Sequence, residues 1–183
     1  MSEAIGERQL SDGELVARMQ ARSPDAFDIL VERYRKSIYR LARAMTQNHD
    51  AADDLSQETF VRAYKRIRQL KNPESFGPWL RKILVNLCIR RSAKIMPASL
   101  EDHEIESPEC PSADAERSMV RESVRGAIME LDPAERAAVL LHYMEGLKQI
   151  EIADALGCPV GTIGSRLSRA RCKLRGRLAD LIS

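Results

Sequence analysis

The sequence contains 183 residues, 44% of them hydrophobic, and its 29 lysines and arginines against 27 acids leave a net charge of only +2. No run approaches the roughly 20 apolar residues of a membrane helix, and the N-terminus combines acids with no apolar block, which excludes a signal peptide. We therefore expect a cytoplasmic protein without direct membrane insertion, with a length that suits one ordinary domain or two small helical ones.

The first two predicted helices have clear starts. Ser11 and Glu14 have the spacing of a capping box, and Ser23-Pro24 supplies a cap followed by a first-turn proline. The second helix is amphipathic, because apolar residues return every three or four positions. These apolar residues are Phe27, Leu30, Val31, Tyr34, Ile38, Leu41 and Met45.

A third helix is predicted from Asn48 to about Arg68, with carboxylates in its first turns, where they favour the positive end of the helix dipole. A loop containing Asn72-Pro73 and Gly77-Pro78 follows. A fourth helix then carries the apolar residues Trp79, Leu80, Ile83, Leu84 and Leu87. Because Trp79 belongs to this stripe, we expect it in the core. No alternating pattern typical of a strand competes with these helices.

The composition changes sharply between residues 97 and 113. Residues 101–111 are strongly acidic, contain two prolines and have almost no large apolar side chain. Such a segment buries too little apolar surface to become ordered, which predicts a flexible linker. The expected architecture is therefore all-α, with two small helical domains, residues 1–96 and 114–183, joined by an acidic flexible linker.

The second half of the chain ends in the pattern of a helix-turn-helix. A helix is predicted over residues 115–131, and Asp132-Pro133 starts another that Gly146 ends. In the next two helices Gly157 supplies a left-handed stop and Pro159 a suitable start, so the turn is short. Their apolar faces are Leu147, Ile150, Ile152, Ala153 and Leu156 in the first and Val160, Ile163, Leu167, Ala170 and Leu174 in the second.

Two acid-free basic stretches indicate two contacts with nucleic acid. No acid lies between Glu74 and Glu101 or between Asp154 and Asp180, although both intervals are rich in lysine and arginine. The second interval contains the last helix, whose early turns would meet base edges and whose later turns would meet phosphates. A solvated basic surface helix is the alternative, but the coincidence with a short Gly-Cys-Pro turn favours DNA.

Nothing in the sequence predicts an enzyme, a cofactor or a metal site. Cys88, Cys110, Cys158 and Cys172 lack paired spacing, and the three histidines are scattered. Neither a Gly-rich phosphate loop nor a Gly-x-Ser-x-Gly elbow is present. We expect reduced thiols, with Cys88 and Cys158 as small buried residues and Cys110 as the candidate for exposed reactivity.

Several blocks of the sequence have a familiar order and spacing. They are residues 53–64 (DDLSQETFVRAY), 79–86 (WLRKILVN), 131–136 (LDPAER), 151–153 (EIA) and 157–167 (GCPVGTIGSRL). Together, over about residues 10–178, they resemble the extracytoplasmic-function (ECF) sigma factors, the minimal two-domain class of the bacterial sigma-70 family, which directs RNA polymerase to promoters.

The resemblance implies roles and partners for each part. Residues 1–96 would be a sigma-2 domain that binds core RNA polymerase through the clamp helices of its largest subunit and recognises and melts the minus-10 promoter element. Residues 114–183 would be a sigma-4 domain that reads the minus-35 element and meets the flap of the second-largest subunit. Residues 97–113 would thread through the polymerase. An anti-sigma factor is a further implied partner, and we expect no additional C-terminal domain.

The resemblance also assigns residues to three contacts. The contact with core polymerase consists of Asp53, Asp54, Gln57, Glu58 and Arg62. The minus-10 DNA contact consists of Lys71, Asn72, Phe76, Arg81, Lys82, Asn86, Arg90 and Arg91. The minus-35 DNA contact consists of Thr162, Gly164, Ser165, Arg166, Ser168, Arg169 and Arg171.

Some of these assignments have simpler alternatives. The aspartates near residue 50 could merely complement a helix dipole, although this leaves Gln57 and Glu58 unexplained. Asn86 could be a surface residue and not part of a pocket for a flipped base. The sequence leaves open whether Phe76 packs in the core or contacts DNA.

The minus-35 residues depart from the family pattern. Gly164 and Ser168 stand where relatives often carry a larger or basic side chain. Base readout is therefore expected from Thr162, Ser165 and Arg166, with Arg169 and Arg171 on phosphates.

The alternative function is a stand-alone helix-turn-helix regulator. It would explain the second half of the chain but leave the first hundred residues without a purpose. A regulator should bind its duplex site specifically by itself, whereas a sigma factor should need core polymerase.

Overall fold

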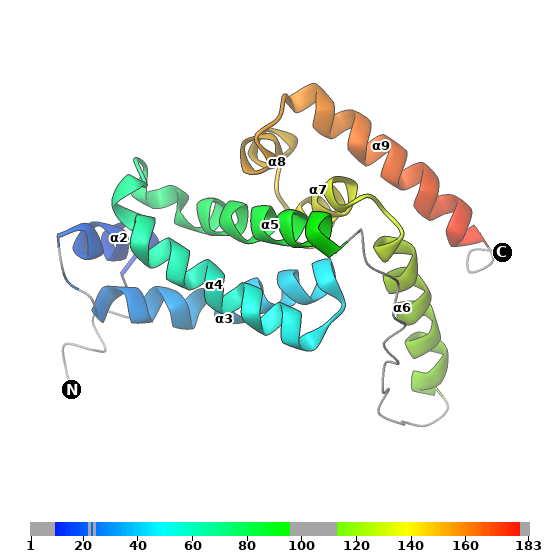
Figure 1. Ribbon diagram of the computed structural model, residues 1–183, viewed down its shortest axis with the longest axis horizontal. Coiled ribbons are helices and arrows are strands. Elements are labelled where there is room, and N and C mark those ends of the chain that lie inside the picture. The colour runs from blue at the N-terminus through cyan, green and yellow to red at the C-terminus, as the bar shows by residue number, and fades with distance from the viewer. Residues whose placement is uncertain (1–9, 22, 24, 96–112, 180–183) are drawn as a thin grey trace.

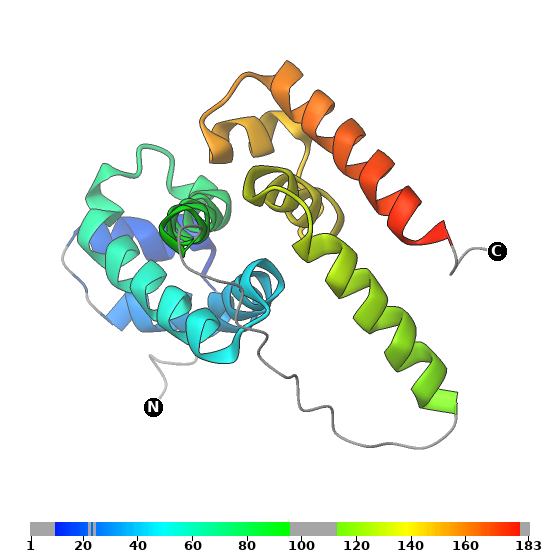
Figure 2. The same ribbon diagram turned by 45° about the vertical axis from the view of Figure 1, so that its right-hand side comes forward.

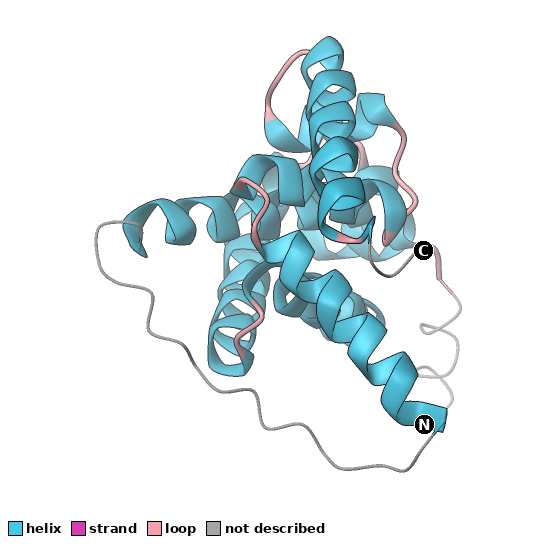
Figure 3. Ribbon diagram, turned by 90° about the vertical axis from the view of Figure 1, so that its right-hand side faces the viewer, coloured by secondary structure: helices cyan, strands magenta, loops and turns pink. Residues whose placement is uncertain are grey.

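The computed structural model describes residues 10–21, 23, 25–95 and 113–179, and within these ranges every regular element is a helix (Figure 1). Figure 3 shows the same chain coloured by secondary structure, with helices joined by short loops. Pro24, Cys110 and the predicted linker up to residue 112 lie outside the described residues. The elements are α2 (Asp12–Gln20), α3 (Asp25–Thr46), α4 (His49–Arg66), η1 (Ile67–Gln69), η2 (Pro73–Ser75), α5 (Phe76–Ile95), α6 (Ala113–Met129), α7 (Pro133–Tyr143), α8 (Gln149–Leu156) and α9 (Val160–Arg177).

The first domain is a bundle in which α3 packs against α2, α4 and α5. The predicted capping box at its start is confirmed, because the Glu14 N–H donates to Ser11 Oγ and the Ser11 N–H donates to the Glu14 carboxylate. Burial of each large apolar side chain stabilises the bundle by about 1.5–3 kcal/mol relative to exposure. The fully buried ones include Leu15, Leu30, Ile38, Leu41, Leu80 and Leu84.

The fourth predicted helix starts earlier than expected. Helix α5 begins at Phe76, so Gly77-Pro78 lie in its first turn and not in the preceding loop. A proline is compatible with this turn, because the first N–H groups of a helix have no partner within it. Just before α5, Asn72 caps the 3₁₀ turn η2, where its Oδ1 accepts a hydrogen bond from the Glu74 N–H at 3.2 Å. Much of the expected loop is therefore helical.

The second domain has the predicted caps and turn. Asp132 caps α7 by accepting a hydrogen bond from the Ala134 N–H at 2.9 Å. Helix α7 ends at Tyr143, slightly before Gly146, which has a φ of 70°. Gly157, with a φ of 63°, ends α8, and α9 follows directly after Pro159. The helix-turn-helix prediction is confirmed.

Two residues of the predicted apolar faces are exposed. Ile150 is 64% exposed and Val160 39% exposed. Helix α8 buries Ile152, Ala153 and Ala155, because it packs between α5 and α9. Ile150 lies two residues before Ile152, and a helix turns by about 200° over two residues, so Ile150 points away from this core. The expected placement of Ile150 and Val160 was wrong.

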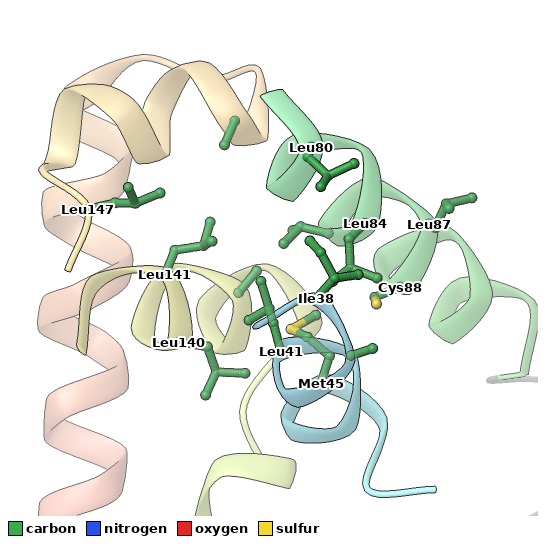
Figure 4. Packing of buried hydrophobic residues seen from close by; sticks show 14 of the residues in the cluster. Ile38, Leu41, Met45, Leu80, Leu84, Leu87, Cys88, Leu140, Leu141 and Leu147 are labelled. Carbon is green, nitrogen blue, oxygen red and sulfur yellow. The ribbon is translucent and has the colours of Figure 1, made fainter. Parts of the chain in front are cut away.

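The two domains share one hydrophobic core, which the sequence did not predict. Helix α5 packs against α7 and α8, and α3 packs against α7 (Figure 2). Figure 4 shows side chains from α3, α5 and α7 meeting at this seam. They include Ile38, Leu41 and Met45 of α3, Leu84 and Cys88 of α5, and Leu140 and Leu141 of α7.

Arg136 of α7 lies at the seam and is only 6% exposed. Its guanidinium donates hydrogen bonds to the carbonyls of Met45 at 2.7 Å, Ile128 at 3.2 Å, Met129 at 2.5 Å and Leu131 at 3.1 Å. These carbonyls lie at the C-terminal ends of α3 and α6, where free carbonyls and the helix dipole favour a cation. Burial lowers the pKa of Arg136 from its ordinary value. One side chain therefore joins both domains.

Candidate nucleic-acid and protein interfaces

The residues assigned to the polymerase contact form an exposed acidic ridge on α4. Asp54 and Glu58 are each tied to a cation: Arg91 of α5 lies 3.6 Å from the Asp54 carboxylate, and Arg62 pairs with Glu58 at 2.5 Å. Asp50 is the acid in the first turn of α4, so the helix dipole does not account for the ridge. Its exposed members are Asp53, Asp54, Gln57 and Glu58.

A groove of about 430 Å³ runs beside this ridge, between α3 and α4. Exposed Val61 and Tyr64 lie further along α4. An apolar groove next to a charged ridge suits a helix of a partner protein. Sequence reasoning missed the groove because periodicity places Val31 on the buried face of its helix. The groove is lined by Val31, Arg35, Lys36, Tyr39, Asp53, Ser56, Gln57 and Phe60.

Phe76, one of the expected minus-10 residues, is a core residue in this structure. Its side chain has no exposed surface. Its ring packs edge-on against Tyr34, with centroids 5.4 Å apart, and lies 6.0 Å from the ring of Trp79. A ring that fills the core cannot stack on a base, so Phe76 leaves the set of DNA contacts. Trp79 is partly buried against the same core, as predicted.

The other expected minus-10 residues fall into two groups. Lys71, Asn72 and Arg90 are exposed, and the Asn72 side chain caps η2. Arg91 is partly buried and faces Asp54 of the acidic ridge. The second group, Arg81, Lys82 and Asn86, faces the second domain.

This second group is engaged by acids and a carbonyl of the second domain. Arg81 Nε lies 2.5 Å from the Glu145 carboxylate, and Lys82 Nζ lies 3.2 Å from Asp154. The Asn86 side-chain amide donates to the Lys82 carbonyl at 2.8 Å and to a carbonyl of α8 at 3.5 Å. The polar edge expected for a base pocket therefore faces protein here. The sequence contained no signal that Glu145 or Asp154 would contact α5.

The expected minus-35 residues lie along α9. The Arg166 guanidinium lies 3.4 Å from Cys158 Sγ in the turn, and the Ser165 hydroxyl donates to the carbonyl one turn earlier at 2.9 Å. A Cβ added at Gly164 would meet Gln149 Oε1 at 3.6 Å, an ordinary contact, so packing does not require glycine there. The exposed members are Ser165, Ser168, Arg169 and Arg171, and the partly buried ones are Thr162, Gly164 and Arg166.

Glu135 of α7 anchors two cations of α9. Its carboxylate, 7% exposed, lies 3.2 Å from Arg169 Nε and 2.7 Å from Lys173 Nζ. Burial raises the pKa of Glu135, but the hydrogen bonds and charges of Lys173 and Arg169 outweigh it, so the pKa lies below its ordinary value. Sequence reasoning missed this residue because the acid and the cations lie on different helices.

The described residues contain no group of three or more histidine, cysteine or acidic side chains that could hold a metal ion. Cys88 is buried, which raises the pKa of its thiol to about 12, whereas Cys158 is partly exposed and Cys172 exposed. The expectation for Cys88 is confirmed. Across the described part of the chain, no helix is long and apolar enough to cross a membrane.

Known families match both halves of the chain. Residues 30–95 match the family described as Sigma-70 region 2, and residues 121–174 match Sigma-70, region 4. The ECF RNA polymerase sigma factor SigW of Bacillus subtilis is 31% identical over 179 residues, which cover 91% of this chain and 96% of that protein. SigM of Mycobacterium tuberculosis is 34% identical over 179 residues, covering 96% and 89%. SigE of Mycolicibacterium smegmatis is 37% identical over 166 residues, and the chain spans 64% of that protein's length.

Two solved structures resemble the whole fold. CnrH in complex with the cytosolic domain of CnrY has a TM-score of 0.70 and 27% identity and covers 94% of this chain and 99% of its own. The sigma factor RpoE in complex with the anti-sigma factor NepR, from Bartonella quintana, has a TM-score of 0.67 and 25% identity and covers 85% and 98%.

Proposed function

The chain belongs to the ECF sigma factors of the sigma-70 family, and from this membership we propose that it directs core RNA polymerase to specific promoters and initiates transcription of stress- or signal-response genes in the cytoplasm. The observation that carries the proposal is the presence of region 2 and region 4 in one chain, each with its own charged surface. Sigma factors initiate transcription without catalytic groups of their own, so the polymerase supplies the chemistry.

Each domain has a separate task in this proposal. Residues 1–96 dock on the clamp helices of the largest polymerase subunit and hold the melted minus-10 strand. Residues 114–183 read the minus-35 duplex and meet the flap of the second-largest subunit. Residues 97–113, with their acidic composition, connect the two within the polymerase.

The acidic ridge of α4 carries the polymerase contact. Its exposed carboxylates and amide suit a polar interface that steers association. The adjoining groove, with apolar Val61 and Tyr64 nearby, supplies the apolar surface that such an interface also needs. The proposed contacts are Asp53, Asp54, Gln57, Glu58 and Arg62.

Helix α5 and the loop before it carry the minus-10 contact. Cations hold a melted backbone, and an amide at a pocket edge can read an unstacked base. Without Phe76, the proposed residues are Lys71, Asn72, Arg81, Lys82, Asn86, Arg90 and Arg91.

Helix α9 carries the minus-35 contact. Thr162, Ser165 and Arg166 lie in its early turns and would meet base edges, while Arg169 and Arg171 would meet phosphates. Gly164 and Ser168 leave room for close approach of the backbone to the groove. Control by an anti-sigma factor is also proposed, since the related RpoE was solved with such a partner.

Run-off transcription tests this proposal. Purified core polymerase is assayed on DNA from upstream of this protein's own gene, with and without the protein. We expect a discrete start only with the protein, lost in the double variant Asp54→Ala, Glu58→Ala. A matched control, Asp25→Ala with Asp28→Ala, removes two exposed acids of α3 and should keep the start.

The competing function gives a different result. A stand-alone regulator would produce no transcript and would bind a duplex tightly and specifically without polymerase. That outcome would leave the assignment of α4 without support.

A further inference from the structure

The face of α5 assigned to the promoter strand is covered by the chain's own second domain. Helix α8 and the loop before it lie on α5 (Figure 2). Two acids of this segment reach cations of α5, namely Glu145 to Arg81 and Asp154 to Lys82. Arg81 and Lys82, which are proposed to bind phosphates of the promoter strand, are thus paired with carboxylates of the same chain.

The pair between Arg81 and Glu145 is largely shielded from water. Their side chains are 17% and 4% exposed. The Ser37 hydroxyl of α3 also lies within hydrogen-bond distance of both Glu145 carboxylate oxygens, at 3.3 and 3.4 Å, and the Arg81 guanidinium lies 6.0 Å from the centre of the Tyr34 ring. A buried pair of this kind is costly to break at one partner, because the remaining charge is left uncompensated.

The geometry points to an intramolecular competition: Glu145 and Asp154 occupy the phosphate-binding positions of α5, so the second domain and a nucleic-acid strand bind the same face in turn. Guanidinium and ammonium groups use the same donors for carboxylates and phosphates. The inference rests on the proposed role of α5 in strand binding.

Further contacts make the closed arrangement specific. Arg136 of α7 donates to the Met45 carbonyl of α3, and the amide of Gln47, which directly follows α3, donates to the Arg125 carbonyl of α6 at 2.7 Å. The shared core adds apolar burial. The strand-binding face is therefore available only in an open fraction of molecules, and the apparent affinity of a strand falls by that fraction.

The distribution of charge agrees with this competition. Asp154 is the last acid before Asp180, so the whole of α9 is left basic, whereas the side of the second domain that meets α5 carries carboxylates.

The test uses the purified full chain without polymerase. Affinity for a labelled single-stranded oligonucleotide of mixed sequence and the radius of gyration from small-angle X-ray scattering are measured together. Glu145→Gln should expand the chain and tighten strand binding by about tenfold, because it raises the open fraction. Asp154→Asn removes one partner of an exposed ion pair. It should also expand the chain, and it should tighten strand binding by about two- to threefold. Asp28→Asn changes net charge equally at an exposed site of α3 and should change neither quantity.

The outcomes separate this inference from the function on which it rests. If Glu145→Gln and Asp154→Asn behave like Asp28→Asn in both measurements while promoter transcription persists, the competition is overturned and the sigma function stands. If the two variants expand the chain without tightening strand binding, α5 is not the strand-binding face, and the competition falls together with that assignment. Because Asp154 is exposed, its variant keeps the test valid should Glu145→Gln fail to fold.

Discussion

Replacing Arg136 should be among the most destabilising single substitutions in this chain. Arg136→Met keeps an unbranched side chain about as long as the aliphatic stem of arginine but removes the guanidinium. The four carbonyl acceptors then lose this donor, although the Ile128 carbonyl keeps the Leu131 N–H at 3.2 Å. Two of these hydrogen bonds, to Met45 and Leu131, are fully buried, and the other two are partly buried, so water can replace the donor only at the latter.

The magnitude follows from these two buried carbonyls. Leaving a buried polar group unsatisfied costs about 1–3 kcal/mol, so with two such carbonyls Arg136→Met should lower the free energy of unfolding by about 2–6 kcal/mol. Arg136→Lys keeps the charge but cannot reach carbonyls on two helices at once, so its loss should be smaller. The free energy of unfolding of a whole domain is typically about 5–15 kcal/mol, so the methionine variant would retain little stability.

Urea denaturation followed by circular dichroism measures this change. Arg121→Met is the matched control, because Arg121 is exposed on α6, and surface substitutions usually stay within about 0.5 kcal/mol. A loss below about 1 kcal/mol for Arg136→Met would refute the reasoning, since it would mean that the buried carbonyls do not depend on the guanidinium.

Three further results are expected. Glu135→Gln should cost about 1 kcal/mol of unfolding free energy at pH 7, because its carboxylate is buried but both cations are more than half exposed. Since the pKa of Glu135 is lowered in the folded state, this contribution to stability is present above its unfolded pKa and disappears as the pH falls through the folded pKa. Thermal unfolding of both proteins between pH 7 and pH 3 checks this pH dependence. A stability loss that is independent of pH would contradict it. Arg166→Ala in the holoenzyme should reduce promoter discrimination by about 1–3 kcal/mol, whereas Arg171→Ala should weaken all duplexes alike and reduce the salt slope by about one; equal losses on cognate and random duplexes would show that the two arginines share one role. Gly164→Ala should raise the unfolding free energy by about 0.5–1 kcal/mol, because the new methyl group makes only an ordinary contact, and a decrease in chemical denaturation would reveal a clash that the structure does not contain.

Local signals in the sequence predicted most of the helices and caps. The capping box at Ser11, the cap at Asp132 and the left-handed Gly157 each depend on a few neighbouring residues, and all three are confirmed. The start of α5 was wrong because Gly77-Pro78 resembles a turn, although a proline is also compatible with the first turn of a helix.

The long-range contacts had no such signal. Whether Phe76 meets DNA or the core depends on Tyr34, which is distant in the sequence. The partnership of Arg81 with Glu145 likewise joins helices of different domains, and no periodicity within either helix encodes it. The roles of the site residues on α4, α5 and α9 stay predictions, supported by their exposure and charge but derived from family membership.

The buried thiol of Cys88 can report the separation of the helices that cover it. Its thiol lies at the seam where α3, α5 and α7 meet, and burial holds its pKa near 12, so almost none of it is the reactive thiolate at neutral pH (Figure 4). An alkylating reagent can reach the sulfur only after the surrounding helices part. Cys172, exposed on α9, reacts continuously and sets the reference rate within the same molecule. The ratio of the two rates, followed by mass spectrometry, would report the fraction of molecules in which the seam is open, without any residue being changed.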